Sequence, residues 1–251
     1  MHPQLDYAQI AVTAPLVIDF GGSSMVMRPR TLGPYKASSS DQGVDTELAS
    51  TRNLPAVRDG VFVHEQGLCE SETVGLGTQV WAFAHVLPGA RIGRDCNICD
   101  GVFVEGEAVI GDRVTVKNQV LVWDRVEIGD DCFLGPGVVF TNDRNPRSSL
   151  REGNDHLLAT KIGPGTTIGA NSTIICGVEI GTHAFIGAGS VVCDDLPGHA
   201  FALGNPARQI GWACLCGNRL DEEFACRDCG RRYRLDEEDQ LIALVDGDKP
   251  A

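Results

Sequence analysis

The chain of 251 residues carries 21 Lys and Arg against 34 Asp and Glu, which gives a formal net charge of −13 at pH 7. This charge disfavours binding to nucleic acid or to an anionic membrane, because both partners are themselves negative. The N-terminus lacks a basic leader segment, and its longest apolar stretch is broken by Thr13, Pro15 and Asp19. We therefore expect a cytoplasmic protein without a membrane span, built from one large domain and small additions.

Residues 1–59 mix Pro, Gly and Ser and show no sustained hydrophobic period. This composition is typical of a segment that buries too little apolar surface to fold by itself. The sequence predicts a poorly ordered N-terminal extension here, with Met27 as an alternative start of the protein.

A six-residue repeat dominates the next part of the chain, residues 60–212. An aliphatic or aromatic residue stands at every sixth position, and the residue four places later is usually small or β-branched. Such a period fits neither a helix nor a simple strand, and it is typical of a hexapeptide β-helix, in which three repeats form one triangular coil. The repeat positions are Val74, Val80, Val86, Ile92, Ile98, Val104, Ile110, Val116, Val122, Ile128, Leu134 and Phe140, then Ile162, Ile168, Ile174, Ile180, Ile186 and Val192.

An insertion at residues 143–160 interrupts the repeat. A long loop without its own hydrophobic period inside a compact fold is usually functional. Asn142 stands at its start and Arg147 within it, and a guanidinium there suits a phosphate or carboxylate of a substrate, or a bracing ion pair. His156 in the same loop is a candidate general base or a structural residue.

Residues 213–251 form a cysteine-rich module followed by an acidic tail, for which a short helix is one expectation. In the run CLCGNRLDEEFACRDCG, two close cysteine pairs are each followed by glycine: Cys214 with Cys216, and Cys226 with Cys229. This is the layout of a zinc knuckle, whose four thiolates leave no open position on the metal, so the Zn²⁺ would be structural. A redox dithiol and a metal-free module remain alternatives.

Seven segments together resemble the nucleotide-sugar N-acetyltransferases of the hexapeptide superfamily. The segments are WAFAHV, DGVFVEGEAVIG, VKNQVLVWD, FTNDRNPRS, GANSTIICGVEIG, FIGAGSVV and GNPARQIGW. They are most similar to the enzymes that acetylate the 3-amino group of UDP-2-acetamido-3-amino-2,3-dideoxyglucuronate in polysaccharide biosynthesis. Enzymes acting on dTDP-3-amino-3,6-dideoxyhexoses are the alternative.

The resemblance implies an all-β fold, a left-handed parallel β-helix, assembled as a homotrimer. It also implies active sites in the clefts between neighbouring prisms, where acetyl-CoA lies on one side and a nucleotide-linked amino sugar enters from the other. Gly187, Ala188 and Arg208 match positions expected to face CoA, with solvated surface as the alternative for Arg208.

One column of residues is expected to carry the chemistry. Residues 18 apart lie above one another on successive coils, which stacks Ala82, Asp100, Asn118 and Pro136. In the enzymes that the chain resembles, this column holds a histidine, an acid or amide, and an asparagine near the reacting nitrogen. Asp100 and Asn118 fit this pattern as catalytic residues, whereas Ala82 departs from it.

Asn118 is expected to orient the amine, and Asp100 to hold it or take a proton. The departing CoA thiolate can accept that proton, so the mechanism does not require a histidine. His85 lies three residues from the column and is a candidate substrate contact, or else a packed corner residue.

Two other classes of function are compatible with a hexapeptide β-helix. A zinc carbonic anhydrase on this fold needs three converging histidines, and the six histidines of this chain lack such spacing. A catalytically inactive scaffold is the remaining alternative. It is disfavoured by the presence of Asp100, Asn118 and the FTND motif.

Overall fold

A computed structural model describes residues 16–19, 24–27, 56–58, 60–149 and 153–244. The chain divides into two units, residues 1–50 and 51–251. In the first unit, β1 (Leu16–Asp19) and β2 (Ser24–Met27) pair in antiparallel fashion. Most of residues 1–59, for which the sequence predicts poor order, lies outside the described residues.

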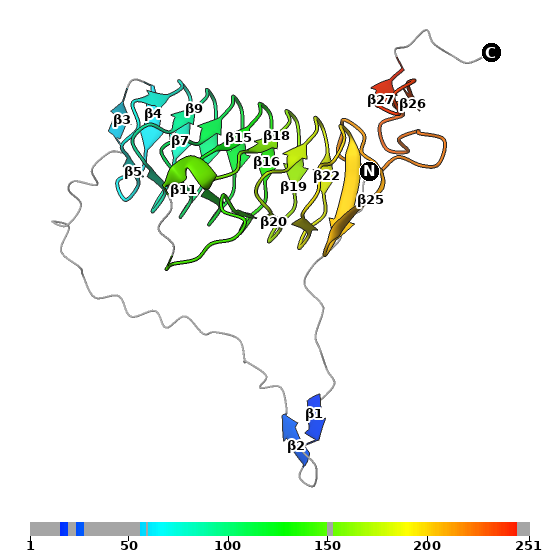
Figure 1. Cartoon of the computed structure of the whole chain (residues 1–251), viewed down its shortest axis with the longest axis horizontal. Helices are drawn as coiled ribbons and strands as arrows, with labels where there is room; N and C mark the ends of the chain where they lie inside the picture. The colour runs from blue at the N-terminus through cyan, green and yellow to red at the C-terminus, as the bar shows by residue number, and fades with distance from the viewer. Residues whose placement is uncertain (1–15, 20–23, 28–55, 59, 150–152, 245–251) are drawn as a thin grey trace, which may run out of the picture. The chain divides into compact units, whose positions relative to one another are not determined.

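The second unit is built around a prism with three parallel sheets as its sides (Figure 1). Sheet I contains β4 (Val61–Val63), β7 (Gln79–Val80), β10 (Asn97–Ile98), β13 (Thr115–Val116), β16 (Phe133–Leu134), β19 (Thr167–Ile168) and β22 (Phe185–Ile186). Sheet II contains β5 (Leu68–Cys69), β8 (His85–Val86), β11 (Phe103–Val104), β14 (Leu121–Val122), β17 (Val139–Phe140), β20 (Thr173–Ile174) and β23 (Val191–Val192). Sheet III contains β6 (Thr73–Val74), β9 (Arg91–Ile92), β12 (Val109–Ile110), β15 (Val126–Ile128), β18 (Thr160–Ile162) and β21 (Glu179–Ile180).

The six-residue repeat sets the register of all three sheets. Ile98 in β10 pairs with Val80 of the preceding coil and with Val116 of the following one. From Val80 to Val192, the repeat residues point inward and are at most 3% exposed. The all-β hexapeptide-repeat fold predicted from the sequence is therefore confirmed.

Tight turns join the sheets at three corners, and most of these turns contain a residue in the left-handed region. At corner I–II this residue is Gly101, Gly137 or Gly189 in three coils, with φ of 68°, 69° and 70°. Phe83 and Gln119 hold the same position in other coils, with φ of 59° and 62°, a conformation that is unfavourable for a residue with a Cβ. Each corner thus repeats one backbone conformation while its side chains vary.

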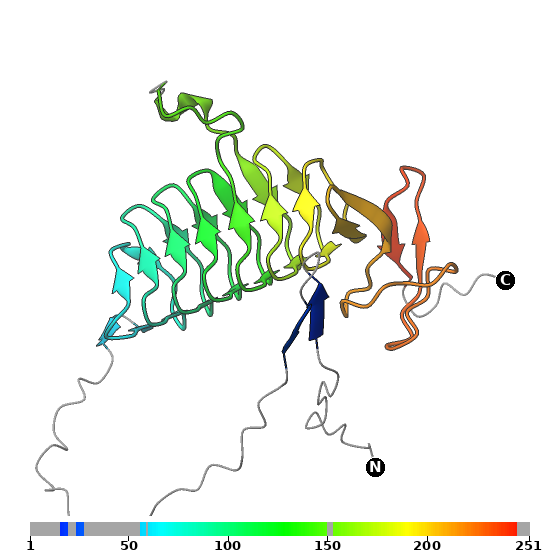
Figure 2. The same cartoon turned by 90° about the horizontal axis from the view of Figure 1, so that it is seen from below.

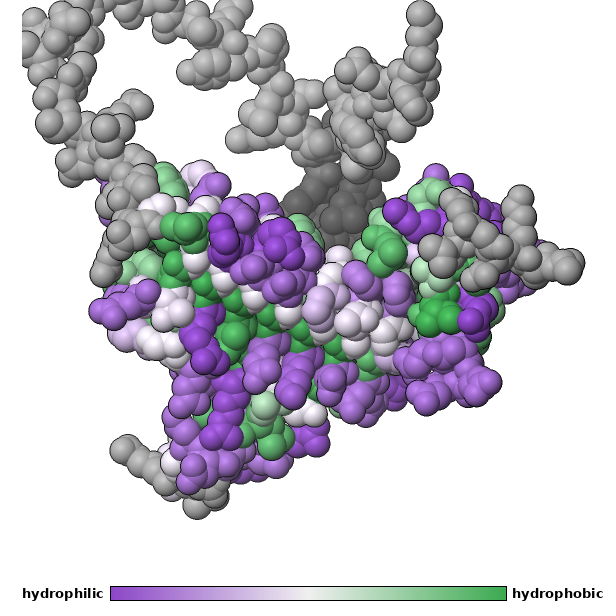
Figure 3. All heavy atoms as spheres, turned by 90° about the horizontal axis from the view of Figure 1, so that it is seen from above, coloured by the Kyte–Doolittle hydropathy of each residue, from purple (hydrophilic) through white to green (hydrophobic). Residues whose placement is uncertain are grey.

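The outer surface of the prism differs between sheets. Outward positions on sheet III are mostly charged or polar and include Arg91, Glu127, Lys161 and Glu179. Those on sheet II are mostly apolar: Leu68, His85, Phe103, Leu121, Val139, Thr173 and Val191. On the face seen in Figure 3, apolar residues form a band along the prism with polar residues beside it.

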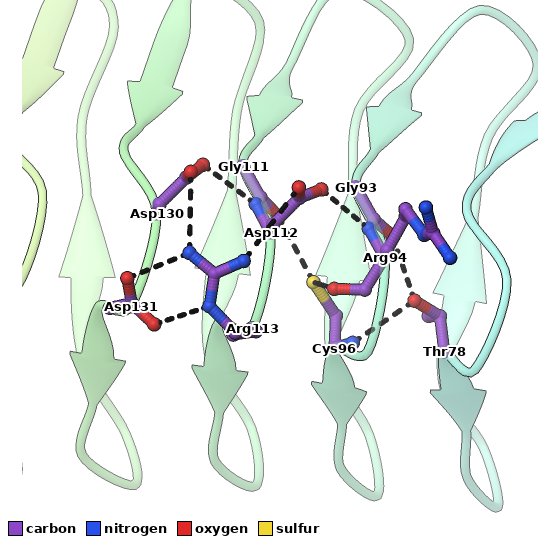
Figure 4. A network of polar contacts seen from close by, with 9 residues as sticks. All are labelled: Thr78, Gly93, Arg94, Cys96, Gly111, Asp112, Arg113, Asp130 and Asp131. Carbon is purple, nitrogen blue, oxygen red and sulfur yellow. Dashed lines mark hydrogen bonds and ion pairs between the residues drawn. The ribbon is translucent and has the colours of Figure 1, made fainter.

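A series of polar contacts between successive coils lies at corner III–I (Figure 4). The carboxylates of Asp112 and Asp130 each accept the backbone N–H of the coil before, at 2.7 and 2.8 Å. Arg113 donates to Asp131 at 2.7 Å and holds the pKa of that carboxyl below its usual range. The ionised Asp131 carboxylate therefore stabilises the fold at pH values above the ordinary pKa of aspartate. This contribution is lost as the pH falls through the lowered pKa of Asp131. Both groups are exposed, so the effect is small.

The insertion after β17 leaves the prism at corner II–III and projects beyond the coils (Figure 2). It contains the 3₁₀ helix η1 (Asn154–His156), the only helix among the described residues. No helix in the described part of the chain is long and apolar enough to cross a membrane.

Antiparallel elements lie at both ends of the prism. At the start, β3 (Ala56–Arg58) pairs with β4. At the other end, β24 (Ala200–Gly204) extends sheet I and pairs with β25 (Ala207–Trp212). The cysteine-rich segment follows, ending in the hairpin of β26 (Tyr233–Leu235) and β27 (Leu241–Ala243).

The expectation of a short helix in the acidic tail is wrong for its described part, residues 236–244. The Asp236 carboxylate accepts the backbone N–H groups of Glu238 and Gln240, which forms a turn. The chain then reverses and Leu241 pairs with Leu235, burying the Leu241 side chain to 6% exposure. Tertiary burial of one leucine decides the conformation against the local helix preference of the acidic residues.

The inward repeat residues should dominate stability. Ile180→Ala removes a fully buried side chain, so we expect it to lower the free energy of unfolding by about 2–5 kcal/mol. Glu179→Ala, one residue away on the outer face of β21, should change it by less than about 1 kcal/mol. Denaturant unfolding of both variants checks this, and equal losses would contradict the inward packing.

Candidate active site

Corner I–II stacks one residue of each coil into a row. The backbone N–H groups of Gly101, Gln119 and Gly137 donate to the carbonyls of Ala82, Asp100 and Asn118, at 3.0, 3.1 and 3.0 Å. The same pattern continues through Pro136 and Ala170 to Ala188. The corner row is thus Ala82, Asp100, Asn118, Pro136, Ala170 and Ala188.

Asp100 and Asn118 are in direct contact within this corner row. The Nδ2 of Asn118 donates to the Oδ2 of Asp100 at 3.1 Å, between an exposed carboxylate and a half-buried amide. Asn118 Nδ2 is directed at Asp100, and Asn118 Oδ1 is the atom of this side chain that can accept a hydrogen bond. The pair therefore presents an amide acceptor beside a carboxylate, which suits a bound amine.

His85 is the first residue of β8, the strand of sheet II that follows corner I–II. Its Nε2 contacts the Oε2 of Glu70 at 2.8 Å, and its ring meets the edge of Phe103 at 5.7 Å between centroids. Phe103 follows Asp100 by three residues and also contacts the ring of Trp123. His85 is therefore oriented by a carboxylate and an aromatic ring on the outer face of sheet II.

The insertion is braced against the prism at its base. The carbonyl of Asn142 accepts the N–H of Leu158 at 2.9 Å, and Arg125 donates to the carbonyl of Leu157 at 2.8 Å. His156 Nε2 lies 3.2 Å from Asp143 Oδ2. Arg147 is exposed. Since the insertion leaves from corner II–III, Asn142 and Arg147 lie at a different corner of the prism from Asp100 and Asn118.

The residues expected to face CoA lie at the C-terminal end of the prism. Ala188 is exposed and belongs to the corner row, and Gly187 precedes it. A Cβ on Gly187 would lie 2.9 Å from the Cβ of Leu203, so the close approach of β24 requires glycine. Arg208 on β25 is 63% exposed at its side chain and donates to Asp194 at 3.1 Å.

Two residues near the site were missed from the sequence. Glu70, the partner of His85, lies in the first coil, where the repeat is weakest. Phe83 is 68% exposed in a left-handed conformation, directly after Ala82 in the corner row. The repeat carries a signal for Phe83, because this residue occupies the position that glycine holds in three other coils.

The four cysteines of the C-terminal module come together as the sequence predicts. Their Sγ atoms all lie within 4.8 Å of one another. A backbone hydrogen bond from Arg231 lowers the pKa of the Cys229 thiol to about 6. No disulfide joins any of the ten cysteines, all of which lie among the described residues.

A family model described as bacterial transferase hexapeptide (six repeats) matches residues 107–142 and 159–194. The dTDP-3-amino-3,6-dideoxy-alpha-D-galactopyranose 3-N-acetyltransferase of Aneurinibacillus thermoaerophilus is 47% identical over 176 residues, covering 69% of this chain and 90% of that protein. The bifunctional protein GlmU of Shouchella clausii is 32% identical over 192 residues, covering 75% of this chain and only 38% of that protein.

Among solved structures, PerB from Caulobacter crescentus in complex with CoA and GDP-perosamine is 27% identical. The match covers 55% of this chain and 58% of that chain, with a TM-score of 0.45. The acetyltransferase domain of PglB from Neisseria gonorrhoeae FA1090 in complex with acetyl coenzyme A is 21% identical, covers 60% and 58%, and has a TM-score of 0.45.

Proposed function

Because this chain belongs to the hexapeptide-repeat nucleotide-sugar N-acetyltransferases, we propose that it acetylates the 3-amino group of a dTDP-linked 3-amino-3,6-dideoxyhexose. The activity of the 47% identical relative supports this acceptor over the UDP-linked glucuronate that the sequence motifs favour. The observation that carries the proposal is the Asp100–Asn118 pair, an amine-binding arrangement on the surface of the prism. The acetylated sugar would serve the biosynthesis of a surface polysaccharide or glycoconjugate, and we place this reaction in the cytoplasm.

The UDP-linked 3-amino-glucuronate is the second candidate acceptor. Arg147 is an exposed guanidinium on the insertion, and a guanidinium pairs well with a sugar carboxylate. A 6-deoxy sugar has no carboxylate to pair with, so this contact separates the two candidates.

In the proposed reaction, the neutral amine attacks the thioester carbonyl of acetyl-CoA. The C–N bond forms, the C–S bond breaks, and the CoA thiolate leaves with the proton of the amine. Asn118 Oδ1 accepts one N–H of the amine and so directs the nitrogen lone pair at the carbonyl. Asp100 fixes the orientation of the Asn118 amide and accepts a hydrogen bond from the other N–H of the amine, without taking that proton. Backbone N–H groups at the corner would stabilise the oxyanion.

Acetyl-CoA is proposed to lie along the prism towards its C-terminal end. Gly187 and Ala188 offer a flat surface without large side chains, in line with Asn118 along the corner row. Arg208 is positioned to contact a CoA phosphate after exchanging its ion pair with Asp194. His85 and Asn142 are proposed to contact the nucleotide sugar.

We further propose that the enzyme is a homotrimer that packs through sheet II. The outer face of sheet II is mostly apolar, and Leu68 and Val139 on it are 51% and 37% exposed. A neighbouring prism on this face would cover that apolar surface. It would also let the insertion at corner II–III of one protomer approach corner I–II of the next.

A charge on sheet II should break this assembly. We expect about 80 kDa for the wild type, three times the 26.8 kDa of one chain, and a monomer for Val139→Asp. The matched control, Val109→Asp on the outer face of sheet III, should remain a trimer. Sedimentation equilibrium measures all three, and a monomeric wild type would overturn the proposed interface.

Asn118 should matter for turnover and little for folding. Asn118→Ala removes the acceptor that orients the amine, so turnover should fall roughly ten- to a thousand-fold. Gln119→Gly is the matched control: it alters the same turn, at a left-handed position where Gly101 and Gly137 stand in other coils. It should keep near-normal turnover.

Turnover and melting temperature are measured on the same preparations of both variants. If Asn118→Ala lost stability but kept the wild-type turnover, Asn118 would serve only its own turn and would have no place in the mechanism.

A panel of acceptors tests the proposed function. With acetyl-CoA, a dTDP-3-amino-3,6-dideoxyhexose should give the highest kcat/KM, and a UDP-3-amino-glucuronate a value at least tenfold lower, which corresponds to about 1.4 kcal/mol of transition-state binding. Mass spectrometry of the product locates the acetyl group. A reversed order would establish the second candidate, and an absence of transfer to every amino sugar would contradict the proposal.

A further inference from the structure

The four cysteines come from two separate segments that the C-terminal module brings together. Cys214 and Cys216 follow β25, and Cys226 and Cys229 precede β26. Cys214 Sγ lies 3.4 Å from Cys229 Sγ, and Cys216 Sγ lies 3.5 Å from Cys226 Sγ. Each close contact therefore joins one cysteine of the first pair to one of the second.

These distances fit a shared metal better than disulfides. Four sulfurs placed tetrahedrally at about 2.3 Å from a zinc ion are about 3.8 Å apart. A disulfide requires about 2.05 Å between the sulfurs. The observed separations of 3.4 and 3.5 Å, with all four sulfurs within 4.8 Å, are close to the tetrahedral value.

Polar groups around the sulfurs also suit a thiolate cluster. Arg231 Nη1 donates to Cys229 Sγ at 3.3 Å, and Asn218 Nδ2 to Cys216 Sγ at 3.6 Å. The hydroxyl of Tyr233 lies 3.2 Å from Cys214 Sγ. Donors of this kind orient the ligands of a metal site and partly neutralise four negative sulfurs around a divalent ion.

The module has too small an apolar core to hold this geometry by itself. Its buried residues, besides Cys214 and Cys226, are Leu220, Tyr233 and Leu241. Domains this small usually need disulfides or a metal to fold. A metal bond between the two cysteine-bearing segments supplies the missing crosslink.

The module is attached to the final coil of the prism through His199. The N–H of Ala213 donates to the carbonyl of His199 at 2.7 Å, and the His199 ring meets the ring of Tyr233 at 5.6 Å. The N–H of Leu220 donates to the carbonyl of Trp212, at the end of β25, at 2.9 Å. Figures 1 and 2 show the module at the end of the prism, next to β25.

We propose that Cys214, Cys216, Cys226 and Cys229 bind one Zn²⁺, and that this centre holds the module as a cap on the C-terminal end of the prism. A cap is needed there because an open strand edge is a site for unwanted pairing with other chains. The donor set of four thiolates has no vacant position for a substrate, so the centre is structural. This inference does not depend on the acceptor or on the mechanism of acetyl transfer.

Metal content and spectroscopy test the site on the full-length protein. Elemental analysis should give one zinc per chain, and replacement by Co²⁺ should give the absorption of tetrahedral thiolate coordination. Cys226→Ser and Cys216→Ser should each lose the bound metal. Cys193→Ser, a half-buried cysteine outside the module, should keep it. Absence of zinc after reconstitution, or full metal content in both module variants, would overturn the site.

Hydrogen exchange tests the cap. Removing the metal from the wild-type protein with a chelator should speed exchange at the amides of Ala213, Leu220 and Tyr233 by about tenfold or more, while the amides of Val104 and Ile174 in the prism stay protected. Restoring Zn²⁺ should reverse the change, which keeps the test valid even if the cysteine variants fold poorly. Unchanged exchange in the metal-free protein would overturn the cap, and mass spectrometry that found two disulfides in the purified protein would overturn the metal site.

Discussion

The coils of the prism follow a common backbone path, because strands pair in parallel with the strand 18 residues before them, or 34 residues before where the insertion intervenes. This pairing places equivalent residues directly above one another at every position of the repeat. The inward position is filled by Val, Ile, Leu or Phe along the whole core, which leaves it no room for chemistry. Functional side chains are therefore restricted to the outer faces of the sheets, the corners and the interruptions of the repeat.

The corners show how one backbone conformation serves different purposes. At corner III–I, the aspartates accept backbone N–H groups of the coil before, and Arg113 pairs with Asp131, so these polar side chains stabilise the fold (Figure 4). At corner I–II, Asp100 and Asn118 contact each other and keep oxygen atoms at the surface. Asp100 accepts from the side chain of Asn118, whereas Asp112 and Asp130 accept from the backbone. It is at corner I–II that we place the transfer of the acetyl group.

The repeat made much of this predictable from the sequence. Its spacing alone stacks Asp100 and Asn118, and the pairing of their backbones follows that register. The clustering of Cys214, Cys216, Cys226 and Cys229 also follows from local spacing. What escaped prediction depends on contacts between elements that share no period: Glu70 beside His85, the bracing of the insertion by Arg125, and the strand at Leu241 in place of a helix. The six-residue repeat does not identify the nucleotide of the acceptor, because its inward positions are set by packing of the core.

A crystal structure with CoA and a dTDP-linked 3-amino sugar bound together would test the central claim most directly. The account predicts the amino nitrogen within about 3.2 Å of Asn118 Oδ1, with the CoA sulfur on the same corner of the prism towards Ala188. An amine bound instead at the His156–Asp143 pair, away from Asp100 and Asn118, would contradict it.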